Sequence, residues 1–282
     1  MKKLKEIREK YEKAAFLIGN GPNLNAGIMH SWKDLLKLAS EKPVTFDTEG
    51  LTNTEVYDLT VLNSKNQDRV KSRIIKLLSL KTHDNINIHK GLMEFALNTD
   101  SPVLTTNFDE ALEKSVQTKI FHVNSKGFTH YYPWKSYYGL KKHIEPTAGF
   151  GIWKIHGDVR YKESIRLGLT DYMGSVERAR KLIHKGRYRL YQNKQIPNWY
   201  GQETWLHIWF TLPIIIFGFG FYTDEVFLRW LLIERKRYFN LFKKSMNVTY
   251  LVKDLPKPGV TNLLQNLDVD IIKVDDYSEI YG

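Results

Sequence analysis

The 282-residue sequence contains no cysteine. Disulfide bonds and zinc sites built on thiolates are therefore excluded. Long apolar runs are also missing: the most apolar stretch, residues 208–221, is too short to span a bilayer and is interrupted by Thr211 and Pro213. We interpret this stretch as a buried strand with its turn.

The amino-terminal region lacks the apolar core of a secretion signal, because charged residues such as Glu6, Arg8 and Glu9 recur throughout it. With neither a signal nor a membrane span, we expect a cytoplasmic protein without a membrane partner. Lys and Arg outnumber Asp and Glu by 42 to 31, a formal charge of +11. This excess favours anionic partners such as nucleotides or nucleic acid, although a basic surface can also serve only solubility.

Short apolar runs that end in glycine or polar residues alternate with helical patterns. Strands are predicted at 14–18, 102–104, 151–155, 212–217, 248–252 and 269–274, and helices at 26–39, 109–116, 175–183 and 224–237. Ser175 is the expected N-cap of the third helix. Repeated strand-turn-helix units predict an α/β fold: a doubly wound, Rossmann-like, mainly parallel sheet whose ligand crevice lies at the carboxyl ends of the strands.

Residues 43–100 show a mainly helical pattern between the first and second strands. We predict that they form an inserted helical lobe, the smaller lobe of a single domain spanning 1–282. The segment 120–150 is rich in Tyr, His, Lys and Gly, and we expect it to be irregular with one or two strands.

An early glycine turn, Gly19-Asn20-Gly21-Pro22-Asn23, follows the first predicted strand. Glycine lets a backbone approach a pyrophosphate, and the amino end of the next helix favours negative charge. An ordinary strand-helix turn is equally consistent with this pattern. The complete GxGxxG fingerprint is absent, so a standard dehydrogenase is disfavoured.

Two polar residues follow later strands. Asn107 comes after Thr105 and Thr106, where its amide can hold a ribose hydroxyl or a water, or can instead form an Asx turn or helix cap. His156 stands between an apolar strand and Gly157, a position suited to acid-base chemistry, although most histidines are structural.

A late glycine pair, Gly218 and Gly220, is followed by Asp224 and Glu225. The pair can contact the adenosine half of a dinucleotide. Alternatively, it is a tight turn followed by carboxylates that stabilise the amino end of a helix.

Together these motifs resemble the sirtuin family, in particular its prokaryotic branch without the zinc module. Gly19 and Gly21 match the first glycine turn of the family, and Asn23 stands in the place of a serine. Residues 106–109 are similar to its Asn-Asp motif. The pair His156-Gly157 resembles its catalytic histidine and the glycine that follows. The order and spacing agree over roughly the whole chain. The resemblance implies that Asn107 and His156 are catalytic, and that His156 acts on a hydroxyl of the nicotinamide ribose. The residues it implies for dinucleotide binding are Gly19, Asn20, Gly21, Asn23, Thr106, Asp109, Gly218, Gly220 and Asp224.

The resemblance implies NAD as substrate and no metal. Because the cysteine zinc module is missing, it favours an NAD+ hydrolase that releases nicotinamide and ADP-ribose as an effector of antiphage defence, aborting infection by NAD depletion. Control through a homo-oligomer or a HerA-type DNA translocase ATPase is expected, with nucleic acid engaged through that partner. Two alternatives stay open: a non-catalytic subunit of a DNA-translocase complex that senses NAD or ADP-ribose, and an NAD-dependent protein deacylase.

Overall fold

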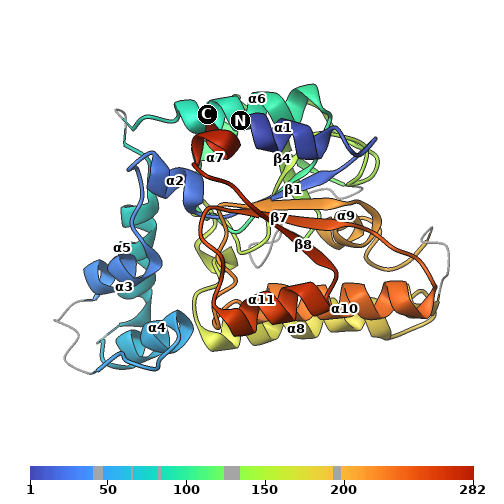
Figure 1. Cartoon of the computed structure of the whole chain (residues 1–282). Coiled ribbons are helices and arrows are strands. Elements are labelled where there is room, and N and C mark those ends of the chain that lie inside the picture. The colour runs from blue at the N-terminus through green and yellow to red at the C-terminus, as the bar shows by residue number, and fades with distance from the viewer. Residues whose placement is uncertain (41–46, 65, 82–83, 124–133, 193–197) are drawn as a thin grey trace.

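An eight-stranded sheet forms the centre of the computed structural model, which describes residues 1–40, 47–64, 66–81, 84–123, 134–192 and 198–282 (Figure 1). The strand order is β3-β4-β5-β2-β1-β6-β7-β8. The strands are β1 (Ala15–Ile18), β2 (Val103–Thr105), β3 (Lys119–His122), β4 (Ser136–Gly139), β5 (Ile152–Lys154), β6 (Ile214–Phe217), β7 (Val248–Val252) and β8 (Val269–Lys273).

Strands β5, β2, β1, β6, β7 and β8 run parallel, and β3 and β4 add an antiparallel edge. Numbered among themselves along the chain, the parallel strands follow the order 3-2-1-4-5-6 of doubly wound nucleotide-binding sheets. The predicted Rossmann-like α/β fold is confirmed. The strand order reverses between β1 and β6, and ligands of such sheets bind outside the carboxyl ends of the strands at that point.

Helices cover both faces of the sheet because successive residues of a strand point to opposite sides. Ala15 and Leu17 pack with α8, α9, α10 and α11, whereas Phe16 and Ile18 pack with α1, α6, α7 and α12. These helices are α1 (Lys2–Arg8), α6 (Asn87–Asn98), α7 (Ala111–Ser115), α8 (Leu169–His184), α9 (Trp205–Thr211), α10 (Val226–Leu241), α11 (Pro258–Asn266) and α12 (Ser278–Tyr281). Central strands buried on both faces read as continuous apolar runs, which is why the sequence marked them clearly.

A third hydrophobic core holds α3 (Trp32–Ala39), α4 (Asn53–Leu62) and α5 (Gln67–Leu78) together beside the sheet, on the side where α2 (Gly21–Asn25) follows β1 (Figure 1). Phe108 and Val159, from the loops after β2 and β5, enter the same core. Helix α6, which ends the predicted helical segment, packs instead on the sheet face with α1. The start of that segment, residues 43–46, lies outside the described residues, so the division into lobes stays a prediction.

Two of the predicted helices depart most from the observed ones. Residues 26–39 are not one helix, because α2 ends at Asn25, Gly27 adopts a φ of +68°, and α3 begins at Trp32. The predicted helix 175–183 begins earlier, at Leu169. There the carboxylate of Asp171 accepts hydrogen bonds from the N–H groups of Leu167 (3.1 Å) and Gly168 (3.4 Å). Ser175 therefore lies inside α8 and is not its N-cap.

The apolar stretch 208–221 is only partly a strand. Its first residues belong to α9, which ends before Pro213, and only β6 is extended. Proline disfavours a helical conformation at the residue before it, which explains the break. The segment 120–150, which is rich in Tyr and His, contains β4 and most of β3. Residues 124–133 lie outside the described part of the chain. No helix in the described residues is both long and apolar enough to cross a membrane.

Candidate functional site

The candidate residues lie at the carboxyl ends of four neighbouring strands, β5, β2, β1 and β6. Thr105 of β2 is paired with Lys154 of β5, so Asn107 and His156 each stand two residues beyond the same pair. The turns that contain Gly19 and Gly218 follow β1 and β6, on either side of the order reversal. Strand topology thus brings the early glycine turn, the Asn motif, the His-Gly pair and the late glycine turn to one edge.

The two glycine turns pack directly against each other. Gly21 N–H donates to the carbonyl of Gly218 (2.7 Å), and Gly218 has a φ of +62°. A Cβ on Gly19 would overlap the Gly218 backbone, and one on Gly21 would lie 2.5 Å from the Gly218 Cα. Glycine is therefore required at Gly19 and Gly21 for the contact between the turns, whatever ligand approaches them.

Asn107 connects the loop after β2 with the turn after β1. Its Nδ2 donates to the carbonyl of Gly19 (3.1 Å), and its backbone N–H donates to Oγ1 of Thr105 (3.1 Å). Thr105 in turn donates to the carbonyl of Ile18 (2.8 Å), and Thr106 N–H donates to the same carbonyl (3.3 Å). The Asn107 amide is thus held in place, and its Oδ1 accepts no hydrogen bond from the described residues.

Below the glycine turn lies a buried polar network centred on Asn23. The fully buried Asn23 donates from Nδ2 to Asp109 Oδ2 (2.8 Å) and to Asn20 Oδ1 (2.8 Å). Its Oδ1 lies 2.7 Å from Nε2 of His89, on α6. Asp109 also accepts from the N–H of Ala111 (2.8 Å), at the start of α7. Asn23 and Asp109 therefore fix the shape of the site and do not face solvent.

His89 is the residue of this network that the sequence analysis missed. Burial lowers its pKa, with Asp109 opposing the effect, so the neutral ring is favoured. Because Asn23 presents an oxygen, the tautomer with Nε2–H fits the contact, and Nδ1 is left buried without a partner. Nothing near position 89 in the sequence marks this histidine, since its partner is 66 residues away.

His156 is almost fully buried, with 3% of its surface exposed. Its Nδ1 lies 3.2 Å from the carbonyl of Ile155, and its Nε2 lies 3.2 Å from Oε2 of Glu225. The ring meets Tyr172 edge-on, with centroids 5.2 Å apart. Both nitrogens face acceptor oxygens, and a neutral imidazole can donate to only one of them. Gly157, with a φ of +104°, provides the sharp turn that follows.

Most of the strand ends and loops just described fall within a stretch that matches a known family model. Residues 101–232 match the family model of the SIR2-like domain. The match runs from β2 into α10, so it contains Asn107, His156, both late glycines and Asp224, whereas the Gly19 turn precedes it. SIR2-like proteins use NAD. No curated protein matched the chain.

Within the SIR2-like region, Lys154 anchors the loop that carries Asn107. Its side chain is 1% exposed, and its Nζ lies 2.9 Å from Oε1 of Glu113 and donates to the carbonyls of Phe108 (3.2 Å) and Asp109. Burial opposes the charged form of Lys154, but the nearby carboxylates, Glu113 first, outweigh it and raise its pKa. A lysine within a buried strand needs carboxylate and carbonyl partners. The position of Lys154 in an apolar strand is therefore the signal by which the sequence could have revealed its anchoring role.

Glu113 belongs to an ion cluster that connects the candidate site to strand β4. Burial raises the pKa of Glu113 to about 7, although Lys154 and Arg160 both favour its ionised form. Arg160 also bonds Asp158 (3.0 Å) and lies 4.1 Å over the ring of Tyr138, whose hydroxyl donates to Asp158 (2.6 Å). For Asp158, burial is outweighed by these cations and its pKa is lowered.

Hydrogen bonds connect α4 and α5 to the region that matches the family model, including one from Lys162 Nζ to Oδ1 of Asp68 on α5 (2.9 Å). Asn53 of α4 donates to Oδ2 of Asp224 (2.6 Å), beside Glu225. Asp58, also on α4, accepts from the N–H of Leu169 (3.0 Å) at the start of α8. Gly220, Thr106 and Asn20 are half-buried at the rim. Among the described residues, no group of three or more His, Cys, Asp or Glu could hold a metal ion.

Proposed function

We propose that the protein is an NAD+ hydrolase that cleaves the bond between nicotinamide and ribose, releasing nicotinamide and ADP-ribose. The observation that carries this proposal is the placement of Asn107 and His156 at adjacent strand ends beside the glycine turns, within a stretch that matches a family using NAD. This is the position where doubly wound sheets bind dinucleotides.

The N-glycosidic bond breaks through a state with oxocarbenium character, so an enzyme must hold the ribose and place one water. Asn107 suits this role because Nδ2 is fixed on Gly19 while Oδ1 is available as an acceptor. Oδ1 would accept a hydrogen bond from the attacking water or from a ribose hydroxyl. A fixed acceptor orients that group at little entropic cost at the moment of reaction.

His156 would hydrogen-bond the hydroxyls of the nicotinamide ribose through Nε2. In the structure that nitrogen faces Glu225, at the amino end of α10. Binding of NAD therefore requires the Glu225 contact to be exchanged for the ribose hydroxyl. The adjacent Asn53–Asp224 hydrogen bond lies on the same turn, so displacement of α4 and exchange at His156 would be coupled.

The remaining assignments extend this proposal. Gly19, Asn20, Gly21, Thr106, Gly218, Gly220 and Asp224 would surround the dinucleotide, with Asn23 and Asp109 supporting them from below. Of the predicted insert 43–100, α4 and α5 would act as the smaller lobe, together with α3, which precedes the insert. The resemblance to the defence branch supports a regulated effector that depletes NAD, controlled as a homo-oligomer or by a HerA-type ATPase.

The test is chromatographic measurement of nicotinamide and ADP-ribose after incubation of the purified protein with NAD, alone and with the product of a neighbouring gene. Asn107→Ala and His156→Ala are each expected to lower the rate by about 100-fold or more while remaining folded. The matched controls, Asn262→Ala on exposed α11 and His122→Ala on the edge strand β3, should retain it.

NAD binding without any product would instead support the sensing alternative. Nicotinamide release that depends on an acylated peptide would support the deacylase. Product formation that is unchanged in both site variants would show that the hydrolysis occurs elsewhere.

A further inference from the structure

Both ring nitrogens of His156 are occupied in this structure, so neither is available to a ribose hydroxyl. Nδ1 lies 3.2 Å from the carbonyl of Ile155, and Nε2 lies 3.2 Å from Oε2 of Glu225. The His156 side chain is 3% exposed and that of Glu225 is 17% exposed, so the carboxylate is the more open of the two groups. A ribose hydroxyl can bond Nε2 only after this carboxylate has moved.

Glu225 makes its only side-chain contact with this histidine. It is the N-cap residue of α10, yet its side chain makes no cap hydrogen bond. Among the described residues, its carboxylate has no partner other than Nε2 of His156. Attraction to the amino end of a helix accounts for a carboxylate at this position. It does not account for the direction of that carboxylate, toward a buried imidazole.

The preceding residue, Asp224, is held by helix α4. Nδ2 of Asn53 donates to Oδ2 of Asp224 (2.6 Å), which has no other side-chain partner in the described part of the chain. Asn53 is the first residue of α4, and a capping box fixes the start of that helix. Two contacts, Asn53–Asp224 and His156–Glu225, thus join α4 to the site histidine through two consecutive residues. We call this pair of contacts the latch.

Helix α4 is also connected to the loops that carry the proposed catalytic residues. Tyr57 of α4 and Phe108, the residue after Asn107, are buried in the same core. Asp58 accepts a hydrogen bond from the N–H of Leu169 (3.0 Å), at the start of α8, beside which α4 lies (Figure 1). The position of α4 is therefore linked to the Asn107 loop as well as to His156.

We propose that the latch is an autoinhibitory contact. While Asn53 holds Asp224, Glu225 occupies His156, and release of α4 frees the histidine for the nicotinamide ribose. This inference rests on the proposed function and names its regulation. A ligand that binds only the open state has an apparent affinity reduced by the fraction of molecules in that state. The latch would therefore keep an enzyme that consumes NAD largely inactive until α4 moves.

The test is calorimetric titration with ADP-ribose, which keeps the ribose hydroxyls that His156 would bind and needs no turnover. The KM for NAD is measured beside it. Asn53→Ala changes no charge and lies outside the proposed catalytic and binding residues. It is expected to tighten ADP-ribose binding and to lower the KM about three- to tenfold.

Glu225→Ala is expected to have at least the same effect, partly because it removes a negative charge near an anionic ligand. The double variant should gain less than the product of the two single effects, because both substitutions release the same closed state. The matched controls are Asn63→Ala, at the other end of α4, and Glu177→Ala, on the surface of α8. Both should change binding less than twofold.

Unchanged affinity in Asn53→Ala overturns the proposal. A fall in kcat on Glu225→Ala without tighter binding also overturns it, because Glu225 would then assist the reaction. Absence of ADP-ribose binding by the wild type and by every variant overturns it as well.

These outcomes are distinguishable from those of the hydrolase assay. Tighter ADP-ribose binding in Asn53→Ala, with no nicotinamide released by any variant, would support the latch as a control of nucleotide binding and contradict the hydrolase assignment. Nicotinamide release with the same KM in the wild type and in Asn53→Ala would support the hydrolase and overturn the latch.

Discussion

The buried network around Asn23 makes a quantitative prediction about Asn23→Ala. The substitution removes the donor to Asp109 and the acceptor for His89, both almost fully buried, and one donor to the half-exposed Asn20. A buried polar group left without a partner costs about 1 to 3 kcal/mol, so the two buried partners together imply a loss of about 2 to 6 kcal/mol in the free energy of unfolding. For a chain of this size that corresponds to a decrease in Tm on the order of 10 °C.

Chemical denaturation and a thermal melt of Asn23→Ala measure this loss, with Asn20→Ala as the control. Asn20 contacts water, so its loss should cost only about 0.5 to 1.5 kcal/mol. A double-mutant cycle with His89→Leu isolates the contact: the double variant should be more stable than the sum of the single effects by about 1 kcal/mol or more. If Asn23→Ala costs no more than Asn20→Ala, or if the cycle shows no coupling, the network does not form as described.

Three further predictions concern titrating and charged groups. Burial lowers the pKa of His89, so at a pH below about 6.5 the histidine takes up a proton when the protein unfolds. The wild type should therefore lose stability relative to His89→Leu as the pH falls below that value, and urea titrations at pH 5.5 and 7.5 measure this. Glu113 behaves in the opposite way, because its pKa of about 7 in the folded protein exceeds the 4.5 of the unfolded chain. Its contribution to the free energy of unfolding is therefore complete below pH 4.5 and is lost as the pH rises through 7. Relative to Glu113→Gln, the wild type should lose about 3 kcal/mol in the free energy of unfolding across that pH window. A difference between the two proteins that does not change with pH would contradict the raised pKa. At pH 8, Lys154→Met leaves buried acceptors unpaired and should cost about 3 to 5 kcal/mol in chemical denaturation, whereas a loss under 1 kcal/mol would refute its anchoring role.

The sequence predicted the parallel sheet and the edge at which the site lies, because both depend on local patterns. Strands buried on two faces are continuous apolar runs, and the residues directly after them lie at the carboxyl ends. Asn107 and His156 could therefore be placed by position alone, and the register of β2 and β5 brings them to neighbouring strand ends. Helix boundaries were predicted less well, because the cap of α8 depends on how Asp171 turns back to Gly168.

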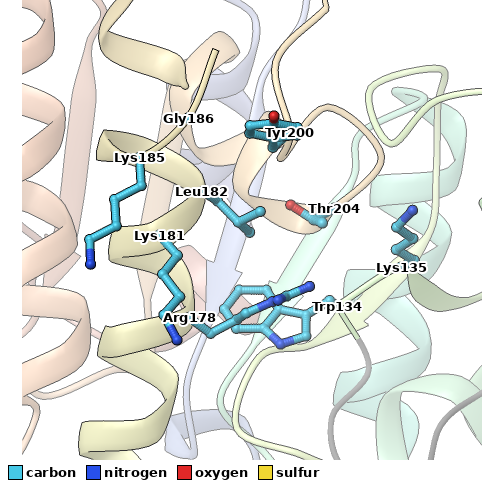
Figure 2. A pocket seen from close by; sticks show the side chains of 9 residues that line it. All are labelled: Trp134, Lys135, Arg178, Lys181, Leu182, Lys185, Gly186, Tyr200 and Thr204. Atoms are coloured by element: carbon cyan, nitrogen blue, oxygen red, sulfur yellow. The ribbon is translucent and has the colours of Figure 1, made fainter. Parts of the chain in front are cut away.

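Only the tertiary structure decided which side chains meet. His89 and Asn23 are 66 residues apart, Lys154 and the carbonyl of Phe108 are 46 apart, and no periodicity in the sequence relates them. The same holds for the hollow of about 500 Å³ beside α8, where Trp134 and Arg178 come together from separate elements (Figure 2). A strand or a turn follows from the chemistry of adjacent residues. A buried hydrogen bond or a pocket depends instead on how whole helices and strands pack, and sequences with a similar pattern can pack differently.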